Sequence, residues 1–460
     1  MRRRKADLSC RVNRELRVEF SESGLTSYAG LELLIRYFQR IDLNALLRQH
    51  LAGLAGDFGV TAMVRVILGL LIVGGRRLRH VTYLAGDPLI ERFCGLARLP
   101  GRVTVSRWLQ QFTARWIQRL CALNAAVVAR TLRMLTALRT LTVDLDGTVM
   151  STGLTVERAF RGFNPHHRKV PSYYPITAYV AETGHLLRVK NRSGNINDGK
   201  ASITFLRELF AQIAATLGGA FRLRFRMDGD FFKQSVLRLL IARGAGYAIK
   251  VPFWQWLDLQ QRIRDCRKWQ RVTHEVDSFE VCLPLTPWQL AMRVAIYRKR
   301  VRHRTAKNYQ LDLFDPSDGY YEYSAVATNL DLGMRRLWHF MCGRGAHEKA
   351  IGELKSGLAF ATIPTRHYGA NSAWQQLVAL AHNLITNFQI ETGAPRRPRS
   401  AKRTSLHVLK SIHTLRFELF HRAGRLVRPD GVTILRMARN EPTKQLFLRM
   451  AQALGGVRAA

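Results

Sequence analysis

The sequence predicts an α/β protein whose catalytic core lies between an all-helical N-terminal domain and helical C-terminal segments. Apolar residues recur at helical spacing before residue 137, strands and helices alternate after it, and a β-rich insertion interrupts the alternation. A chain of 460 residues also exceeds the usual size of a single core. We therefore expect an N-terminal region at 1–136, a core formed by 137–252 and 330–392, an insertion at 253–329, and a basic linker and tail at 393–460.

Helical spacing is clear at residues 31–41, 60–73 and 105–132. The apolar run Val66–Gly74 is too short to cross a bilayer, so a buried helix is expected there. Thr104–Phe112 begins with hydroxyl side chains suited to an N-cap and continues as an amphipathic helix. Two interpretations of this region remain open, the DNA-recognition helix of a helix-turn-helix and a packed helix with a basic outer face.

Alternation of apolar and polar residues begins at Arg139–Met150, where Asp144 and Asp146 fall on the polar face of an expected strand. Further strands are expected at Tyr173–Val180, His185–Lys190, Phe221–Asp228 and Tyr247–Val251, with helices at Gly199–Leu217 and Phe231–Arg243. The resulting order is strand, hairpin, helix, strand, helix, strand. It is the succession of a ribonuclease-H-like sheet, in which parallel strands extend three antiparallel ones.

The charge of the chain is strongly positive. It has 72 Lys and Arg against 33 Asp and Glu, a net charge of +39. Such a surplus indicates a polyanionic partner, most commonly nucleic acid, with a membrane-surface or ribosome-bound protein as the alternative. Six scattered cysteines form neither a zinc motif nor a disulfide framework, and no secretory or membrane-spanning segment is recognised. We expect a cytoplasmic protein without a membrane partner.

Three acids stand out by position. Asp146 lies on the first strand, Asp228 closes a later strand, and Glu348 lies on a later helix. Mg²⁺ prefers hard oxygen ligands such as carboxylates, and a few carboxylates on separate rigid elements can hold it. Two such ions promote phosphodiester cleavage by activating the nucleophile and stabilising the leaving alkoxide. Each acid has a plainer explanation as a turn former or an ion-pair partner. Asp144 is an alternative first metal ligand because it shares the face of Asp146, and Asp230 is a lesser alternative to Asp228.

Arg344 and Lys355 lie four residues before and seven residues after Glu348, which places all three on one helical face. Together with Asp146-Gly-Thr and Arg226-Met-Asp-Gly-Asp-Phe, this spacing resembles the DDE transposases of bacterial insertion sequences. It is most similar to the group with a Y-x2-R-x3-E-x6-K signature around the third acid. The tyrosine position is Met341 here, a departure that puts the DNA contact of that tyrosine in doubt.

The resemblance covers roughly residues 139–390 and implies a ribonuclease-H-like core with a β-rich insertion between the second and third acids. It favours Asp146 over Asp144 as first ligand. It also implies DNA phosphate contacts by Arg344 and Lys355, and Mg²⁺, replaceable by Mn²⁺, as two ions held by the three acids.

The implied activity is binding of terminal inverted repeats, by a homodimer, followed by cleavage of the double-stranded DNA ends and strand transfer to target DNA. A nuclease or resolvase on the same fold and an inactive transposase-derived DNA-binding protein are the alternatives. Trp254 and Trp256 are expected to pack within the insertion, although stacking on an unpaired base is the other use of such residues.

Overall fold

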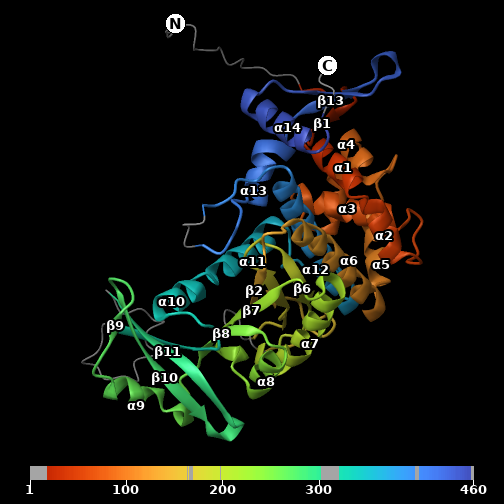
Figure 1. Cartoon of the computed structure of the whole chain (residues 1–460). Helices are drawn as coiled ribbons and strands as arrows, with labels where there is room; N and C mark the ends of the chain where they lie inside the picture. Colours follow the sequence, from red (N-terminus) through yellow and green to blue (C-terminus); the bar gives the residue numbers. More distant parts are fainter. Residues whose placement is uncertain are drawn as a thin grey trace, which may run out of the picture.

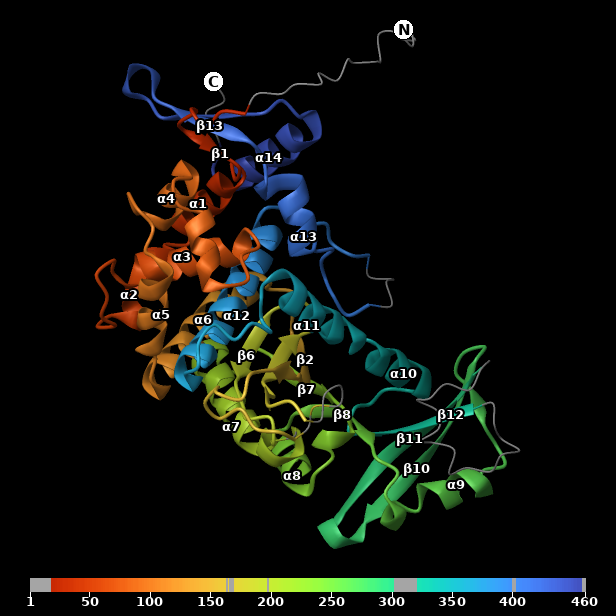
Figure 2. The same ribbon diagram turned by 180° about the vertical axis from the view of Figure 1, so that it is seen from behind.

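The computed structural model describes residues 18–162, 164, 169–196, 198–301, 321–398 and 403–456. A central sheet occupies the middle of the molecule, and long strands extend from one of its ends (Figure 1). At the opposite end, the first helices lie beside the last strands and helix of the chain (Figure 1, Figure 2). The beginning and the end of the described chain are therefore neighbours.

The N-terminal region is built from helices packed around one apolar core, as the periodicity predicted. Its elements are α1 (Leu31–Arg40), α2 (Leu43–Leu51), α3 (Val60–Ile72), the 3-10 helix η2 (Leu78–Tyr83), α4 (Pro88–Cys94), α5 (Arg102–Gln110) and α6 (Ala114–Met134). Every residue of α3 from Met63 to Ile72 is buried, which confirms the predicted buried helix. Within the described part of the chain, no helix is long and apolar enough to span a membrane.

The central sheet has the strand order β6-β5-β2-β7-β8-β12-β11-β10-β9 in the described residues. Its first five strands are β2 (Thr140–Gly147), β5 (Ile176–Val180), β6 (Leu186–Lys190), β7 (Arg222–Met227) and β8 (Gly246–Val251). β2 pairs antiparallel with β5, and β5 with β6, whereas β2, β7 and β8 run parallel. Helices α7 (Asp198–Leu217) and α8 (Gln234–Ala242) connect the parallel strands, so the predicted succession of elements is present.

The two faces of β2 meet different surroundings. Leu141, Val143 and Leu145 are buried in the apolar core that also contains residues of α7 and α8. On the other face, Thr142 and Asp144 are fully buried, although the sequence placed them where a solvent-facing side would be. Helices from the C-terminal half of the chain pack on that face, where Phe340 contacts Arg226 and His347 stacks on Tyr179.

Three helices return to the sheet after the long strands, namely α10 (Met334–Cys342), α11 (Gly345–Gly357) and α12 (Tyr368–Glu391). α12 lies along the outer edge of β6. The Asn383 amide accepts a hydrogen bond from the backbone N–H of Leu186 and donates one to its carbonyl, both at 2.9 Å. The Gln376 side chain donates to the carbonyl of Val189 at 2.6 Å. These amides satisfy backbone groups that an edge strand would otherwise leave unpaired.

The stretch predicted as a β-rich insertion continues the central sheet. It contains α9 (Leu259–Asp265), β9 (Gln270–Arg271), β10 (Val276–Leu285) and β11 (Leu290–Arg300), and β12 (Tyr321–Thr328) returns to the core. β12 pairs antiparallel with β8, so its strands share one hydrogen-bonded sheet with the core strands. β10 has 10 residues and β11 has 11, so the insertion is built on two long strands.

The C-terminal tail is not purely helical, which corrects the prediction. β13 (Gly424–Val427) and β14 (Ile434–Met437) form an antiparallel pair, and β13 also pairs with β1 (Leu25–Thr26). Pro429-Asp-Gly431 between them is a turn signal that the prediction overlooked. The short α13 (Ile412–Leu415) precedes these strands, and α14 (Glu441–Ala453) follows them. Part of the predicted basic linker, residues 399–402, lies outside the described residues.

The buried Arg416, next to α13, joins the tail to the rest of the molecule. Its guanidinium donates hydrogen bonds of 2.7 Å to the carbonyls of Leu71 and Ile72, at the end of α3, and to the carbonyl of Gly357, at the end of α11. The last carbonyls of a helix have no partner within the helix and carry partial negative charge. One arginine thus donates hydrogen bonds to the last carbonyls of two helices.

Candidate active site

Two of the predicted acids lie side by side where β2 and β7 end. Asp144 and Arg226 are partners in the parallel register of these strands. Two residues further along each strand, Asp146 and Asp228 therefore come together on the same face. Ligands gather at the carboxyl ends of parallel strands in open α/β sheets, so this position suits a functional site.

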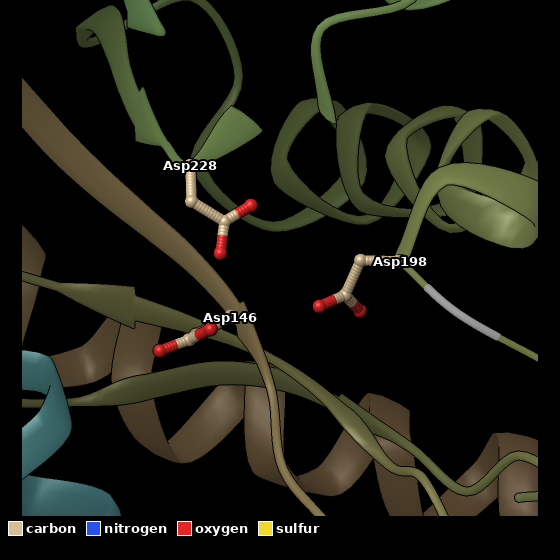
Figure 3. Close-up of side chains that lie close together, drawn as sticks. All are labelled: Asp146, Asp198 and Asp228. Atoms are coloured by element: carbon tan, nitrogen blue, oxygen red, sulfur yellow. The ribbon is translucent and has the colours of Figure 1, made fainter. Parts of the chain in front are cut away.

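Asp198 joins these two acids from a third element (Figure 3). It is the first residue of α7, and one carboxylate oxygen of each of Asp146, Asp198 and Asp228 lies within 4.8 Å of the others. Asp198 is only 1% exposed, pairs with Arg192, and accepts a hydrogen bond of 3.1 Å from the N–H of Gly147. Sequence reasoning missed it, because an acid that starts a helix is ordinarily explained as a cap.

Arg344 places its guanidinium between the first and second acids. It immediately precedes α11 and is 8% exposed. Its Nη2 atom lies 3.0 Å from Oδ1 of Asp146 and 3.2 Å from Oδ2 of Asp228. The resemblance implies a DNA phosphate contact for this residue, which stays a prediction; in this structure its guanidinium offsets part of the repulsion between the two carboxylates.

Burial dominates the electrostatics of Asp146. Desolvation raises the pKa of its carboxyl to about 7, Arg344 opposes that rise, and the negative charges of Asp228, Asp198 and Glu348 add to it. Burial likewise raises the pKa of Asp198. Carboxyl groups held in this way ionise more readily when a further positive charge is near.

Glu348 and Lys355 both lie on α11, but the structure places them differently. Glu348 is exposed in the first turn of the helix and is not part of the group of three aspartates. Lys355 is partly buried and donates a hydrogen bond of 3.0 Å to the carbonyl of Val149, just beyond β2. Burial lowers the pKa of Lys355, and the negative charge of Asp146 opposes that change.

Asp144, the alternative first ligand, does not reach this group. Its carboxylate forms a two-pronged ion pair with Arg226, with Nη2 at 2.7 Å from Oδ2, and both side chains are fully buried. Arg226 also donates to the carbonyl of Phe340 at 2.6 Å, which ties β7 to α10. The Asp144–Arg226 pair therefore lies beneath the site and holds the strands and the helix together.

A family model described as "Transposase DDE domain group 1" matches residues 8–459 of the chain. The chain belongs to this transposase family. Among solved structures, it is similar to the piggyBac transposase in a synaptic complex with hairpin DNA, with a TM-score of 0.43 and 10% identity, over 95% of this chain and 84% of that chain. No curated protein sequence matches this DDE-domain chain.

The donor set of this DDE-domain chain fits a hard divalent cation. Three carboxylates from three separate elements converge, and the group contains neither a cysteine nor a histidine. Oxygen-only sites of this kind suit Mg²⁺ or Mn²⁺. Residues Asp146 and Asp228 would hold such an ion, with Asp198 and Glu348 as candidates for the third acid.

Two further residues fix the position of β2 in the site. A Cβ atom on Gly147 would lie 2.3 Å from Cε1 of Tyr174 and 2.5 Å from Oδ1 of Asp198, so only glycine fits there. The buried His347 on α11 lies 2.8 Å from the hydroxyl of Thr177, which in turn donates to the carbonyl of Asp146 at 3.2 Å. Burial, helped by nearby arginines, lowers the pKa of His347 to about 3, so the ring is neutral.

The predicted N-cap of the region Thr104–Phe112 is wrong. α5 begins at Arg102, its N-cap is Gly101 without a side-chain hydrogen bond, and Thr104 lies inside the helix. Val105, Trp108 and Leu109 form its buried face. The start was misplaced because a hydroxyl inside the first turn has the same sequence signature as a capping hydroxyl.

Trp254 and Trp256 belong to an aromatic cluster with Trp288 and Phe232. The rings of Trp254 and Trp256 stack with centroids 5.9 Å apart, and the ammonium of Lys233 lies 5.3 Å from the Trp254 ring. The predicted packing is present for Trp254, whereas Trp256 is 44% exposed.

Proposed function

We propose that the chain is the transposase of an insertion sequence, which binds the terminal inverted repeats of its element, cuts the DNA ends and joins them to target DNA. The observation that carries the proposal is the convergence of Asp146 and Asp228 at the ends of two adjacent parallel strands. The strand order, three antiparallel strands extended by two parallel ones, supports a ribonuclease-H-like core. The family match supports the transposase assignment.

Mg²⁺ or Mn²⁺, bound as two ions, would supply an activated water or 3′-hydroxyl and stabilise the leaving alkoxide. The residues of the chain hold the reacting groups. Asp146 and Asp228 present their carboxylates from rigid strand ends, and the hydrogen bond from Gly147 to Asp198 fixes the end of β2. Arg344 places a positive charge beside the same two carboxylates, and its guanidinium would contact a DNA phosphate bound there.

We assign Glu348 as the third catalytic acid. Both oxygens of Asp198 are already engaged, one by Arg192 and the other by the N–H of Gly147 and the hydroxyl of Tyr174. Glu348, in contrast, is exposed and has neither an ion pair nor a side-chain hydrogen bond among the described residues. A free carboxylate can turn toward an ion without losing a partner, whereas Asp198 would leave buried donors unpaired.

The direct test is end cleavage and strand transfer on DNA that carries the chain's own coding frame with its flanking sequence. Asp146→Asn, Asp228→Asn and Glu348→Gln should abolish Mg²⁺- or Mn²⁺-dependent cleavage, while gel-shift binding of the same DNA is retained. Asp57→Asn, at an exposed position outside the site, is the matched control. Normal cleavage by Asp228→Asn would overturn the assignment.

The same assay separates the alternatives. Cleavage without strand transfer would indicate a nuclease or resolvase, and DNA binding without cleavage would indicate an inactive transposase-derived protein. We further propose that the chain acts as a homodimer that holds two DNA ends, in the bacterial cytoplasm. Sedimentation with and without end DNA tests the dimer.

A further inference from the structure

An arginine-lined groove lies on the N-terminal helices, outside the group of carboxylates. Its volume is about 920 Å³, and it runs between α5 and the segment 361–364. Four arginines line it, Arg77 and Arg79 from the η2 side and Arg102 and Arg107 from α5. All four are exposed, and none forms an ion pair or a side-chain hydrogen bond in the part of the chain that the structure describes.

A second groove, of about 460 Å³, continues the first toward the site. The two share Ala361, Ile363 and Pro364, and the second is also lined by Ser151 and Arg366. Ser151 follows β2 closely in the chain. No acidic side chain lines either groove among the described residues. The two grooves together run from Ser151, close after β2, to the arginines of α5.

The groove is held at a fixed place relative to the carboxylates. The guanidinium of Arg76, next to η2, donates hydrogen bonds of 3.2 Å to the carbonyls of Lys355 and Ser356 in the last turn of α11. The residue before α11 is Arg344, which contacts Asp146. α11 thus links a residue beside the groove, Arg76, with a residue beside the carboxylates, Arg344.

We propose that this groove holds the phosphate backbone of the double-stranded DNA whose end reaches the carboxylates. The choice of DNA as the polyanion rests on the proposed function. Guanidinium groups without acidic partners are free to make paired hydrogen bonds to phosphate oxygens. Ser106 and Gln110, on the same wall of α5, add a hydroxyl and an amide, which are common donors to the backbone. These contacts fix the position of the duplex without reading its sequence.

The test is the salt dependence of binding, measured in EDTA by fluorescence anisotropy with a labelled 30-base-pair DNA duplex of arbitrary sequence. Arg102→Gln/Arg107→Gln should lower the slope of log Kd against log [KCl] by nearly two and weaken binding about tenfold, because two phosphate contacts are lost. The control is Arg264→Gln/Arg267→Gln, at and just after α9. It removes the same charge from exposed positions at the other end of the molecule (Figure 1, Figure 2).

An equal change in the two double variants would overturn the proposal, since it would indicate only the overall charge of the chain. A loss confined to an RNA duplex of the same length would also overturn it. The binding test needs no metal ion, so it is independent of cleavage. If the natural chain cleaves DNA but the groove variants bind it with the same salt dependence as the control, the groove proposal fails and the proposed function stands. If the groove variants bind more weakly but the natural chain does not cleave DNA, the proposed function fails and the groove proposal stands.

Discussion

The carboxyl group of Asp146 makes the site costly to fold, and Asp146→Asn measures that cost. Burial raises the pKa of Asp146 from 3.8 to about 7. Between these values the folded chain retains a proton that the unfolded chain releases, so stability falls as the pH rises. At about 1.4 kcal/mol per pH unit, the loss reaches about 4 kcal/mol above pH 7. Asparagine has no charge to bury, so Asp146→Asn should be more stable than the natural chain at pH 8 and nearly equal to it at pH 4.

The assay is urea unfolding followed by tryptophan fluorescence from pH 4 to pH 8, in EDTA. The difference in unfolding free energy between Asp146→Asn and the natural chain should grow across this range and approach about 4 kcal/mol. The weaker ion pair of Arg344 in the variant subtracts from this value. Asp57→Asn, at an exposed position, should show no such trend. Saturating Mn²⁺ should then stabilise the natural chain but not Asp146→Asn, by about 2.7 kcal/mol at a hundredfold excess over Kd. A difference that does not change with pH would refute the reasoning.

Three other substitutions test contacts that hold the strands and helices around the site in place. Gly147→Ala should lower cleavage about 100-fold with DNA binding retained, because its Cβ would displace Asp198; full activity in a cleavage assay would contradict this. Arg226→Met should cost about 3–5 kcal/mol of unfolding free energy by leaving Asp144 buried and unpaired, and adding Asp144→Asn should recover part of it. Arg416→Met should cost about 3 kcal/mol in urea unfolding by leaving helix-end carbonyls unpaired; an unchanged midpoint would exclude that role.

Local patterns were enough to predict much of the fold. Alternation placed β2 and β7 almost at their observed bounds, and helical spacing placed α11. Local signals failed where two of them competed. The hydroxyl of Thr104 resembled a cap inside a helix, and the helical interpretation of the tail hid the Pro-Asp-Gly turn between β13 and β14.

Asp146 and Asp228 could be found from the sequence because each lies at the end of a regular strand, and the register of parallel strands brings such ends together. Asp198 could not, because its approach depends on how α7 packs against the sheet, which no local pattern encodes. The choice between Asp146 and Asp144 was also a tertiary matter. Both share one strand face. Arg226, the register partner of Asp144 on β7, pairs with Asp144, and α10 packs against Arg226, whereas Asp146 lies beside the other acids. Periodicity determines the face on which a side chain lies, whereas its partners there depend on the elements that pack against that face.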